Sequence, residues 1–221
     1  MRARRGTPKR TPAESEPRWP ASLAVVAAIA LYAALPQHYT VGPVWLLPAF
    51  EGTMLVGLSL TAPRRHPGEA KVFRACAMLL IGVVTVANFF ALGQLIDRLL
   101  HGSRAEGTEL VLAAVQIWLT NVLVFALWFW ELDRGGPGER RRQEQDADFL
   151  FPQMMTPGAR KEGWKPGFVD YLYVSFTNAM AFSPTDTMPL SKWAKLLMLA
   201  ESLASLLTVA FVAARAVNIL S

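Results

Sequence analysis

Long runs of apolar residues constrain this chain more than any other feature, because five of them approach the length that crosses a lipid bilayer. A helix needs about 20 mostly apolar residues to cross roughly 30 Å of hydrocarbon. The runs lie at residues 19–36, 43–61, 75–96, 110–130 and 193–220. We therefore expect each of them to be a transmembrane helix.

The composition supports this interpretation and argues against several others. Hydrophobic residues make up 52% of the chain and charged residues 18%, and the mean hydropathy is +0.28. A soluble domain carries about 25% charged residues. A disordered chain, a small disulfide scaffold and a nucleic-acid-binding domain are therefore poor interpretations. The prediction is an all-α, polytopic transmembrane helix bundle whose partner is the lipid bilayer, with no nucleic acid bound.

A sixth apolar stretch, at 167–183, leaves the number of spans open. It contains Asp170 and Asn178 and is short for a span, so it predicts either a sixth transmembrane helix or a re-entrant pore-like helix. The first run follows a basic tail, as a signal peptide does, but no small-residue cleavage site precedes Gln37. We expect the first run to be a retained helix.

The basic residues predict the orientation. Cytoplasmic connections of membrane proteins are rich in Lys and Arg. Seventeen of the 22 lie before the first run, between the second and third runs, or between residues 133 and 167. This predicts a protein of the bacterial inner membrane with a cytoplasmic N-terminus and a cytoplasmic loop at 133–166. Six spans then make 184–190 an outer turn, whereas a re-entrant 167–183 leaves five spans and places one basic cluster outside.

These predictions divide the chain into four parts. Residues 1–18 are expected to be a disordered basic cytoplasmic tail, and 19–132 a four-helix transmembrane bundle. Residues 133–166 are expected to be a polar cytoplasmic loop, in which 135–148 is disordered or solvated and the apolar stretch 149–155 is a candidate interfacial segment. Residues 167–221 are expected to form a pore-like helix, a turn and a long final transmembrane helix.

Motifs of catalysis and metal binding are absent from the sequence. Cys76 is the single cysteine, and His38, His66 and His101 lie in different connections. The sequence contains no phosphate-binding glycine loop, hydrolase elbow or zinc-protease motif. We expect no catalytic residues, no metal site and no cofactor, and therefore a protein that is not an enzyme.

Polar residues inside the apolar runs are the candidate functional groups, because an ionisable group in the membrane needs a partner, water or a proton. Glu51 lies in the second run, and the amides of Asn88, Gln94, Gln116 and Asn121 interrupt the third and fourth. In the last run an intramembrane polar stripe follows one helical face: Glu201, Ser205, Thr208 and Arg215. This stripe is expected to face protein or water, either as a packing face or as the lining of a pathway.

The segment from Asp170 onward resembles the pore module of bacterial two-helix ion channels. Tyr173, Ser175 and Phe176 match the aromatic pore helix, Asp186 matches the acid that closes the filter, and Glu201 matches a feature of the inner helix. The resemblance makes the following residues pore or turn candidates: Asn178, Ser183, Pro184, Thr185 and Asp186. The filter glycines are missing and Pro184 restricts the backbone, which excludes potassium selectivity by the usual filter.

The same segment also resembles a family of uncharacterised bacterial multi-pass inner-membrane proteins. The shared signature consists of Ser175, Phe176, Thr177, Met180, Phe182, Asp186 and Thr187. This resemblance implies a membrane protein without an established activity. It is compatible with descent from a channel pore that lost its filter.

Three functional hypotheses follow. The leading one is an ion-channel-like homo-oligomer that conducts an inorganic ion, with the Glu201 stripe facing the axis. The second is a non-conducting membrane scaffold or partner-binding protein. The third is a membrane enzyme or transporter in which Glu51, Asp170 or Glu201 handles a proton; it is the weakest, because nothing supplies a nucleophile, metal or cofactor.

Overall fold

The computed structural model consists of helices, as the all-α prediction expects, together with one small two-stranded sheet. It describes residues 18–40, 69–101, 107–137, 139–140, 146–156, 158, 164–181 and 186–220, apart from the side chains of 69–71, 73 and 215–220. The predicted span 43–61 with Glu51, and the turn candidates Ser183, Pro184 and Thr185, lie outside these residues. The helices are α1 (Trp19–Ala33), α3 (Glu69–Leu100), α4 (Gly107–Leu132), α5 (Pro152–Met155), α6 (Phe168–Ala181) and α7 (Lys192–Leu220).

Three of these helices are long and apolar enough to cross a membrane. They cover Arg74–Leu100, Gly107–Gly135 and Lys192–Ala214, and correspond to the third, fourth and last predicted runs. α1 matches the first run but has only 15 residues. α6 has 14 residues, so it is about 21 Å long at 1.5 Å per residue, less than the thickness of the hydrocarbon core.

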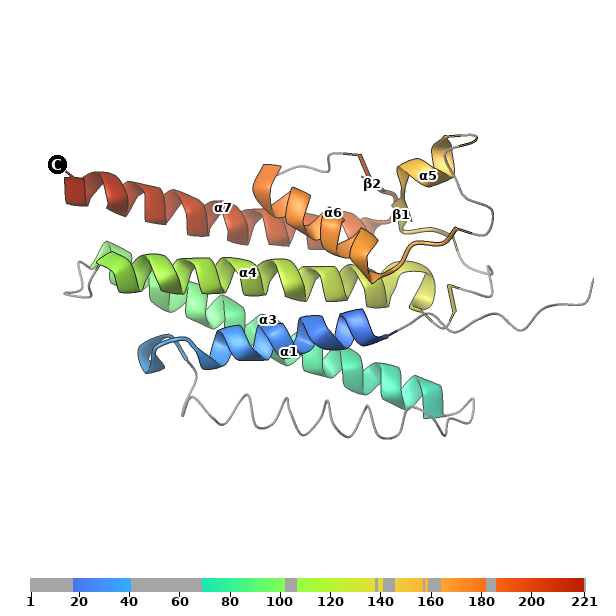
Figure 1. Ribbon diagram of the computed structural model, residues 1–221, viewed down its shortest axis with the longest axis horizontal. Helices are drawn as coiled ribbons and strands as arrows, with labels where there is room; N and C mark the ends of the chain where they lie inside the picture. The colour runs from blue at the N-terminus through green and yellow to red at the C-terminus, as the bar shows by residue number, and fades with distance from the viewer. Residues whose placement is uncertain are drawn as a thin grey trace, which may run out of the picture.

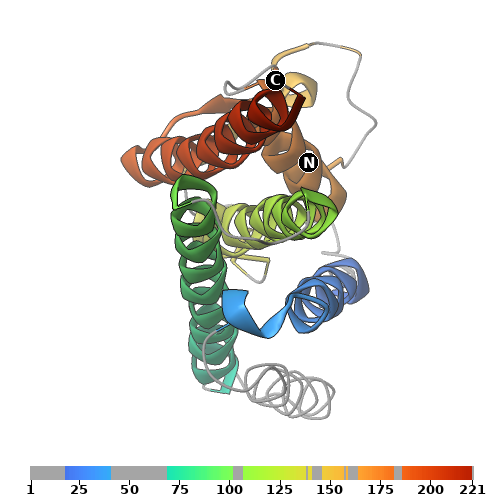
Figure 2. The same ribbon diagram turned by 90° about the vertical axis from the view of Figure 1, so that its left-hand side faces the viewer.

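α4 is the central helix of the bundle (Figures 1 and 2). It packs against α1, α3, α6 and α7, and in the end view these four helices surround it. Its sequence explains the position, because apolar residues occur around the whole of its C-terminal half and such a helix is stable only when buried. Ala126 and Phe129 have no exposed surface at all.

The core has two clusters, which mark the two ends of the bundle. At one end Ala24 of α1 and Ile81 of α3 pack with Phe129 of α4 and Met198 of α7. This end also holds the two-stranded sheet, and we call it the sheet end. At the other, the far end, the core consists mainly of residues from α1, the 3-10 turn η1 (Gln37–Tyr39), α3 and the N-terminal half of α4.

The small sheet shows where the chain goes after α6. Strand β1 (Phe149–Leu150) pairs antiparallel with β2 (Met188–Pro189), and the Leu190 N–H donates to the Asp148 carbonyl oxygen at 2.8 Å. Residues 186–190 therefore lie at the same end as the segment that precedes α6, and α7 starts from that end (Figure 1). The six-span arrangement, with 184–190 as a turn opposite 133–166, is not confirmed, because residues 186–190 and the segment before α6 lie at the same end.

The described basic side chains are also concentrated at the sheet end. Among the Lys and Arg side chains that the structure describes, Arg98 lies at the far end, and the sheet end holds Arg18, Arg74, Arg134, Arg140, Lys165, Lys192 and Lys195. The expectation that a returning 167–183 places one basic cluster at the opposite end is wrong for these residues. Lys192 and Lys195 follow residues 184–190, which six spans would make an outer turn, and yet they lie at the sheet end as well.

The segment 133–166 is less polar in its contacts than its sequence indicates. Phe149 and Phe151 are buried, and their rings contact the ring of Tyr171 at centroid distances of 6.1 and 5.3 Å. Trp164 packs against Phe151. In the stretch 149–155, the candidate interfacial segment, Phe149 and Phe151 are therefore part of the core, because the open end of the bundle buries their rings.

Candidate functional site

The polar stripe of α7 faces the interior of the bundle. Glu201 and Ser205 have no exposed surface and Thr208 has 4%. Of the two surroundings expected for the stripe, protein or water, these three residues have protein, while the side chain of Arg215 lies outside the described part. The opposite face of α7 is apolar and exposed, and consists of Trp193, Leu196, Leu199, Leu203, Leu206 and Val209.

Glu201 is the centre of a buried polar network that joins α4, α6 and α7. Its carboxyl oxygens bond to the Ser175 hydroxyl and to the Asn178 side-chain amide, the latter at 2.6 Å. Ser175 Oγ also lies 2.7 Å from the backbone carbonyl oxygen of Val122 on α4. The carboxyl therefore bonds α6 to α7 directly, and Ser175 extends the network to α4.

Two asparagines complete the buried polar network. Asn178 Nδ2 donates to the carbonyl oxygen of Met198 at 2.9 Å, and its Oδ1 accepts from Ser202 at 3.1 Å. Asn121 Nδ2 donates to the Glu201 carbonyl oxygen at 3.2 Å and to Ser205 Oγ at 3.1 Å. Asn121 interrupts the fourth apolar run of the sequence, and in the structure its side-chain amide bonds α4 to α7.

The network has no cationic member. Within the part of the chain that the structure describes, no Lys, Arg or His pairs with the Glu201 carboxyl, whose partners are a hydroxyl and an amide. The described partners of the carboxyl are therefore uncharged hydrogen-bonding groups, and they hold α6 against α7.

A second buried cluster lies at the sheet end and contains a charge pair. Asp133 has no exposed surface and Arg140 has 2%. Arg140 Nη1 lies 3.6 Å from Asp133 Oδ2 and donates to the hydroxyl of Tyr171 at 3.0 Å and to the carbonyl oxygen of Trp130 at 3.0 Å. The Tyr171 hydroxyl donates to Asp133 Oδ2 at 2.5 Å. Arg140 belongs to a segment predicted to be solvated, and this prediction is wrong because the guanidinium turns back to cover the end of α4.

The turn after α4 makes that geometry possible. Arg134 has φ 51° and Gly136 has φ 92°, and a Cβ added at Gly136 would lie 2.9 Å from the Glu131 carbonyl oxygen. The chain can therefore reverse tightly only with glycine at this position. The Arg140 N–H then donates to the Gly136 carbonyl oxygen at 2.9 Å, which places the guanidinium beside Asp133.

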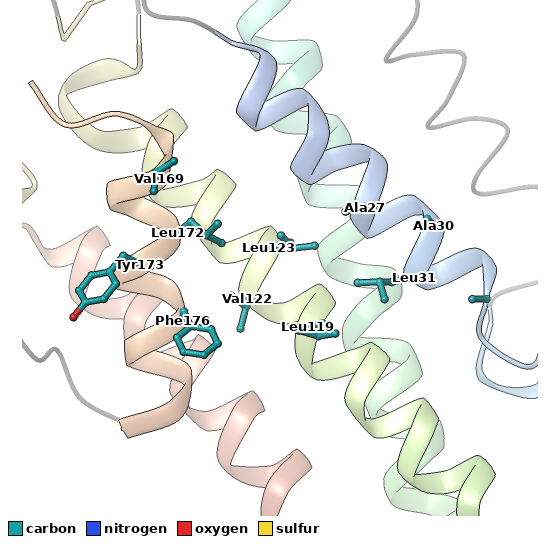
Figure 3. A pocket seen from close by; sticks show the side chains of 11 residues that line it. Ala27, Ala30, Leu31, Leu119, Val122, Leu123, Val169, Leu172, Tyr173 and Phe176 are labelled. Atoms are coloured by element: carbon teal, nitrogen blue, oxygen red, sulfur yellow. The ribbon is translucent and has the colours of Figure 1, made fainter.

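An apolar groove opens between α1 and α6, with α4 as its floor (Figure 3). Its volume is about 790 Å³. The lining residues carry alkyl or aromatic side chains: Ala27, Ala30, Leu31, Ala34, Leu119, Val122, Leu123, Val169, Leu172, Tyr173 and Phe176. Such a surface suits the hydrocarbon interior of a bilayer.

The far end holds a third polar group around Tyr39, which is fully buried. The guanidinium of Arg98 lies 5.3 Å from the centre of its ring, and His38 Nε2 lies 2.7 Å from Glu109 Oε1. Burial raises the pKa of the Tyr39 phenol, the negative Glu109 adds to this shift, and Arg98 opposes it. These contacts attach η1 to α3 and α4.

The other candidates have local roles. Asp170 Oδ2 accepts from the Gly167 N–H at 2.7 Å at the start of α6, and exposed Asp186 accepts from Thr187 at 3.4 Å. The structure brings Asn178 and Glu201 together but leaves Asp186 apart from them, at the sheet end. In the described ranges no group of His, Cys, Asp and Glu could hold a metal ion.

Comparisons with known proteins give no relative of this chain. No protein-family model, no curated protein and no solved structure matches it.

Proposed function

We propose that this chain is a non-conducting integral membrane protein of the bacterial inner membrane, a scaffold that holds a re-entrant helix in the bilayer. The observation that supports this best is the direction of the polar groups of α7. Glu201, Ser205 and Thr208 are buried, and their polar atoms already have partners inside one chain: Ser175 on α6 for Glu201, Asn121 on α4 for Ser205, and the Ala204 carbonyl oxygen of α7 itself for Thr208.

The outer face of α7 supports the same proposal. An oligomer that lined a pore with this helix would present leucines, such as Leu196, Leu199 and Leu203, along the pathway. Ion pathways use backbone carbonyls or charged rings, and hydrophobic constrictions close them by dewetting. Faces of this kind are suited to lipid and to other membrane helices.

The proposed orientation places the sheet end in the cytoplasm. Of the eight described Lys and Arg side chains, all but Arg98 lie at this end, in agreement with the positive-inside rule. With the predicted span 43–61, the chain has five spans and a re-entrant α6, and its C-terminus is periplasmic.

The test of this topology is labelling of single cysteines in a Cys76→Ser background. Asp146→Cys and Asp186→Cys should react only from the cytoplasmic side, and His101→Cys only from the periplasmic side. Labelling of positions 146 and 186 from opposite sides would refute the re-entrant arrangement.

Conductance measurements test the central claim. Purified protein in planar bilayers should give no current above the empty-bilayer background, for several cations and anions and over a range of voltages. Glu201→Gln should be equally silent, and a channel incorporated by the same protocol provides the positive control. Ion-selective currents that change in Glu201→Gln would overturn the proposal.

An ion-channel-like function is the second candidate, because the order α4, α6, return and α7 is that of a pore module. It requires a pathway formed by other groups than the stripe of α7. Currents that persist in Glu201→Gln and change in Asp186→Asn would favour this candidate over the scaffold.

The scaffold proposal also predicts contact with a second copy of the chain. A photo-crosslinking residue at Phe176 of α6 or Leu199 of α7, both exposed, should give a crosslinked dimer in native membranes. The same residue at Phe125, which is buried, is the matched control and should give none. Crosslinks to lipid alone from both exposed positions would remove the self-association part of the proposal.

A further inference from the structure

The Ser175 hydroxyl has one hydrogen but lies close to two oxygen atoms that can both accept a hydrogen bond. Its oxygen lies 2.7 Å from the Val122 carbonyl oxygen and within hydrogen-bond distance of Glu201 Oε1. A serine hydroxyl has one hydrogen, a carbonyl oxygen only accepts, and an ionised carboxylate only accepts. With Glu201 ionised, one of the two short oxygen contacts would have no hydrogen in it and would be repulsive.

We infer that Glu201 carries a proton in the native state, and that this proton is the ligand that closes the contact of α6 with α4 and α7. The carboxyl O–H then donates to Ser175, Ser175 donates to Val122, and Asn178 Nδ2 donates to the other carboxyl oxygen. Every short contact around the carboxyl then contains one hydrogen. The network is a proton-dependent latch on α6.

The surroundings of the carboxyl agree with a neutral acid. No charged side chain in the described ranges of α3, α4, α6 or α7 pairs with it. The described acids of α4 are Glu109 and Glu131, near its ends, and Asp133 follows its last residue. α6 carries Asp170, Tyr171 and Tyr173 in its first half, and α7 starts with Lys192 and Lys195. The described ionisable groups of α3 are Arg74, Cys76, Asp97 and Arg98, towards its ends. An isolated buried carboxylate is strongly disfavoured, and protonation removes that penalty.

Loss of the proton should release α6. An ionised Glu201 competes with Val122 for the single hydrogen of Ser175, so either the contact of α6 with α7 or that with α4 becomes repulsive. The latch inference does not depend on the scaffold proposal, since a conducting protein could contain the same latch.

Infrared difference spectroscopy tests the protonation state directly, in the folded protein in lipid. The spectrum of wild type minus Glu201→Gln should contain the carbonyl stretch of a neutral carboxylic acid at neutral pH. A difference spectrum with carboxylate bands and no acid carbonyl band would overturn the inference. Asp133→Asn is the control, because the pair with Arg140 predicts carboxylate bands for Asp133.

The variants at position 201 provide a second, independent test. Gln reproduces the neutral acid, since its N–H donates to Ser175 and its oxygen accepts from Asn178, so Glu201→Gln should melt close to the wild type. Glu201→Ala should melt several degrees lower. Rising pH should lower the melting temperature of the wild type relative to Glu201→Gln, because the native state keeps a proton that the unfolded chain releases. Equal destabilisation by Gln and Ala, with no pH-dependent difference between wild type and Glu201→Gln, would refute the latch.

Discussion

Two fully buried acids lie in the same bundle and are stabilised in different ways. Asp133, at the sheet end, has a guanidinium 3.6 Å away and a phenol hydroxyl as a donor. Glu201 lies on α7 beside the middle of α4. Its carboxyl is hydrogen-bonded to a hydroxyl and an amide, and no cation among the described residues pairs with it. The difference follows from depth, because a loop residue such as Arg140 can fold back over the end of a bundle but cannot reach its centre.

The comparison explains why only one of the two acids needs a proton. A buried charge is tolerated when an opposite charge and hydrogen bonds surround it, as they do around Asp133. In the middle of the bundle polar helix contacts must be made between neutral groups, and hydroxyl and amide side chains are the usual ones. The sheet end therefore uses electrostatic attraction and the centre uses hydrogen bonds.

The largest predicted effect is at the sheet end, where Arg140→Ala would remove the buried guanidinium beside Asp133 and leave Arg134, whose Nε also lies 3.6 Å from Asp133 Oδ2, as the remaining cation. Removing one partner of a buried ion pair destabilises a protein by about 3–5 kcal/mol, and the loss should lie towards the lower end of this range because Arg134 remains. Thermal unfolding in detergent should show this loss, while Lys195→Ala, an exposed basic residue, should melt as the wild type does. The double variant Asp133→Asn with Arg140→Ala should recover part of the loss. A small effect of Arg140→Ala would mean that the charge pair is not the main interaction there.

The next effect is at the centre, where Asn178→Leu would remove the donor to Glu201 Oε2 and to the Met198 carbonyl oxygen. A buried acceptor left without a donor is disfavoured by about 1–3 kcal/mol. The matched control is Thr177→Ala, the adjacent residue, whose hydroxyl bonds only to carbonyl oxygens of its own helix. Equal stability of the two variants, measured by thermal unfolding, would show that the buried polar network adds nothing specific.

The sequence predicts the long helices and the polar face of α7 because both depend on local patterns. Apolar runs of sufficient length predict α3, α4 and α7, and the spacing of Glu201, Ser205 and Thr208 predicts one polar face towards protein or water, which the structure buries. These features need only the length and periodicity of a single helix.

Local patterns left the return of the chain after α6 as one of two alternatives, and they gave no indication of the inward turn of Arg140. Strands β1 and β2 have two residues each and are about 40 positions apart, so no local pattern indicates that they pair. Arg140 lies in a charged segment that is typical of a solvated loop, and its burial depends on the turn at Gly136 and on Tyr171. Both features depend on contacts between distant segments, which composition does not encode.

A smaller effect is expected from the backbone turn that positions Arg140. Gly136→Ala places a Cβ in a left-handed conformation against the Glu131 carbonyl oxygen, and the destabilisation should be about 1–2 kcal/mol. Gly93→Ala is the matched control: it lies in the interior of α3, its Cβ would meet no atom within 4 Å, and it should be neutral or slightly stabilising. If the two variants melt alike, the turn is not what holds the sheet-end cluster.

The smallest effect is expected at the far end, where a buried hydroxyl has neither kind of stabilisation. Tyr39 Oη has no hydrogen-bond partner among the described residues, while the ring contacts Arg98. Tyr39→Phe keeps the ring and should change the free energy of unfolding by less than about 1 kcal/mol at neutral pH.

Because burial raises the pKa of the Tyr39 phenol, the native state keeps its proton when the unfolded chain loses it near pH 10, and stability falls as the pH rises further. Tyr39→Phe lacks this contribution, so its stability relative to the wild type should increase in alkaline solution, measured as the difference in melting temperature against pH. If the difference in melting temperature between Tyr39→Phe and the wild type does not change with pH, the folded and unfolded chains hold the Tyr39 proton equally well. The far end would then tolerate a negative charge that the centre of the bundle does not.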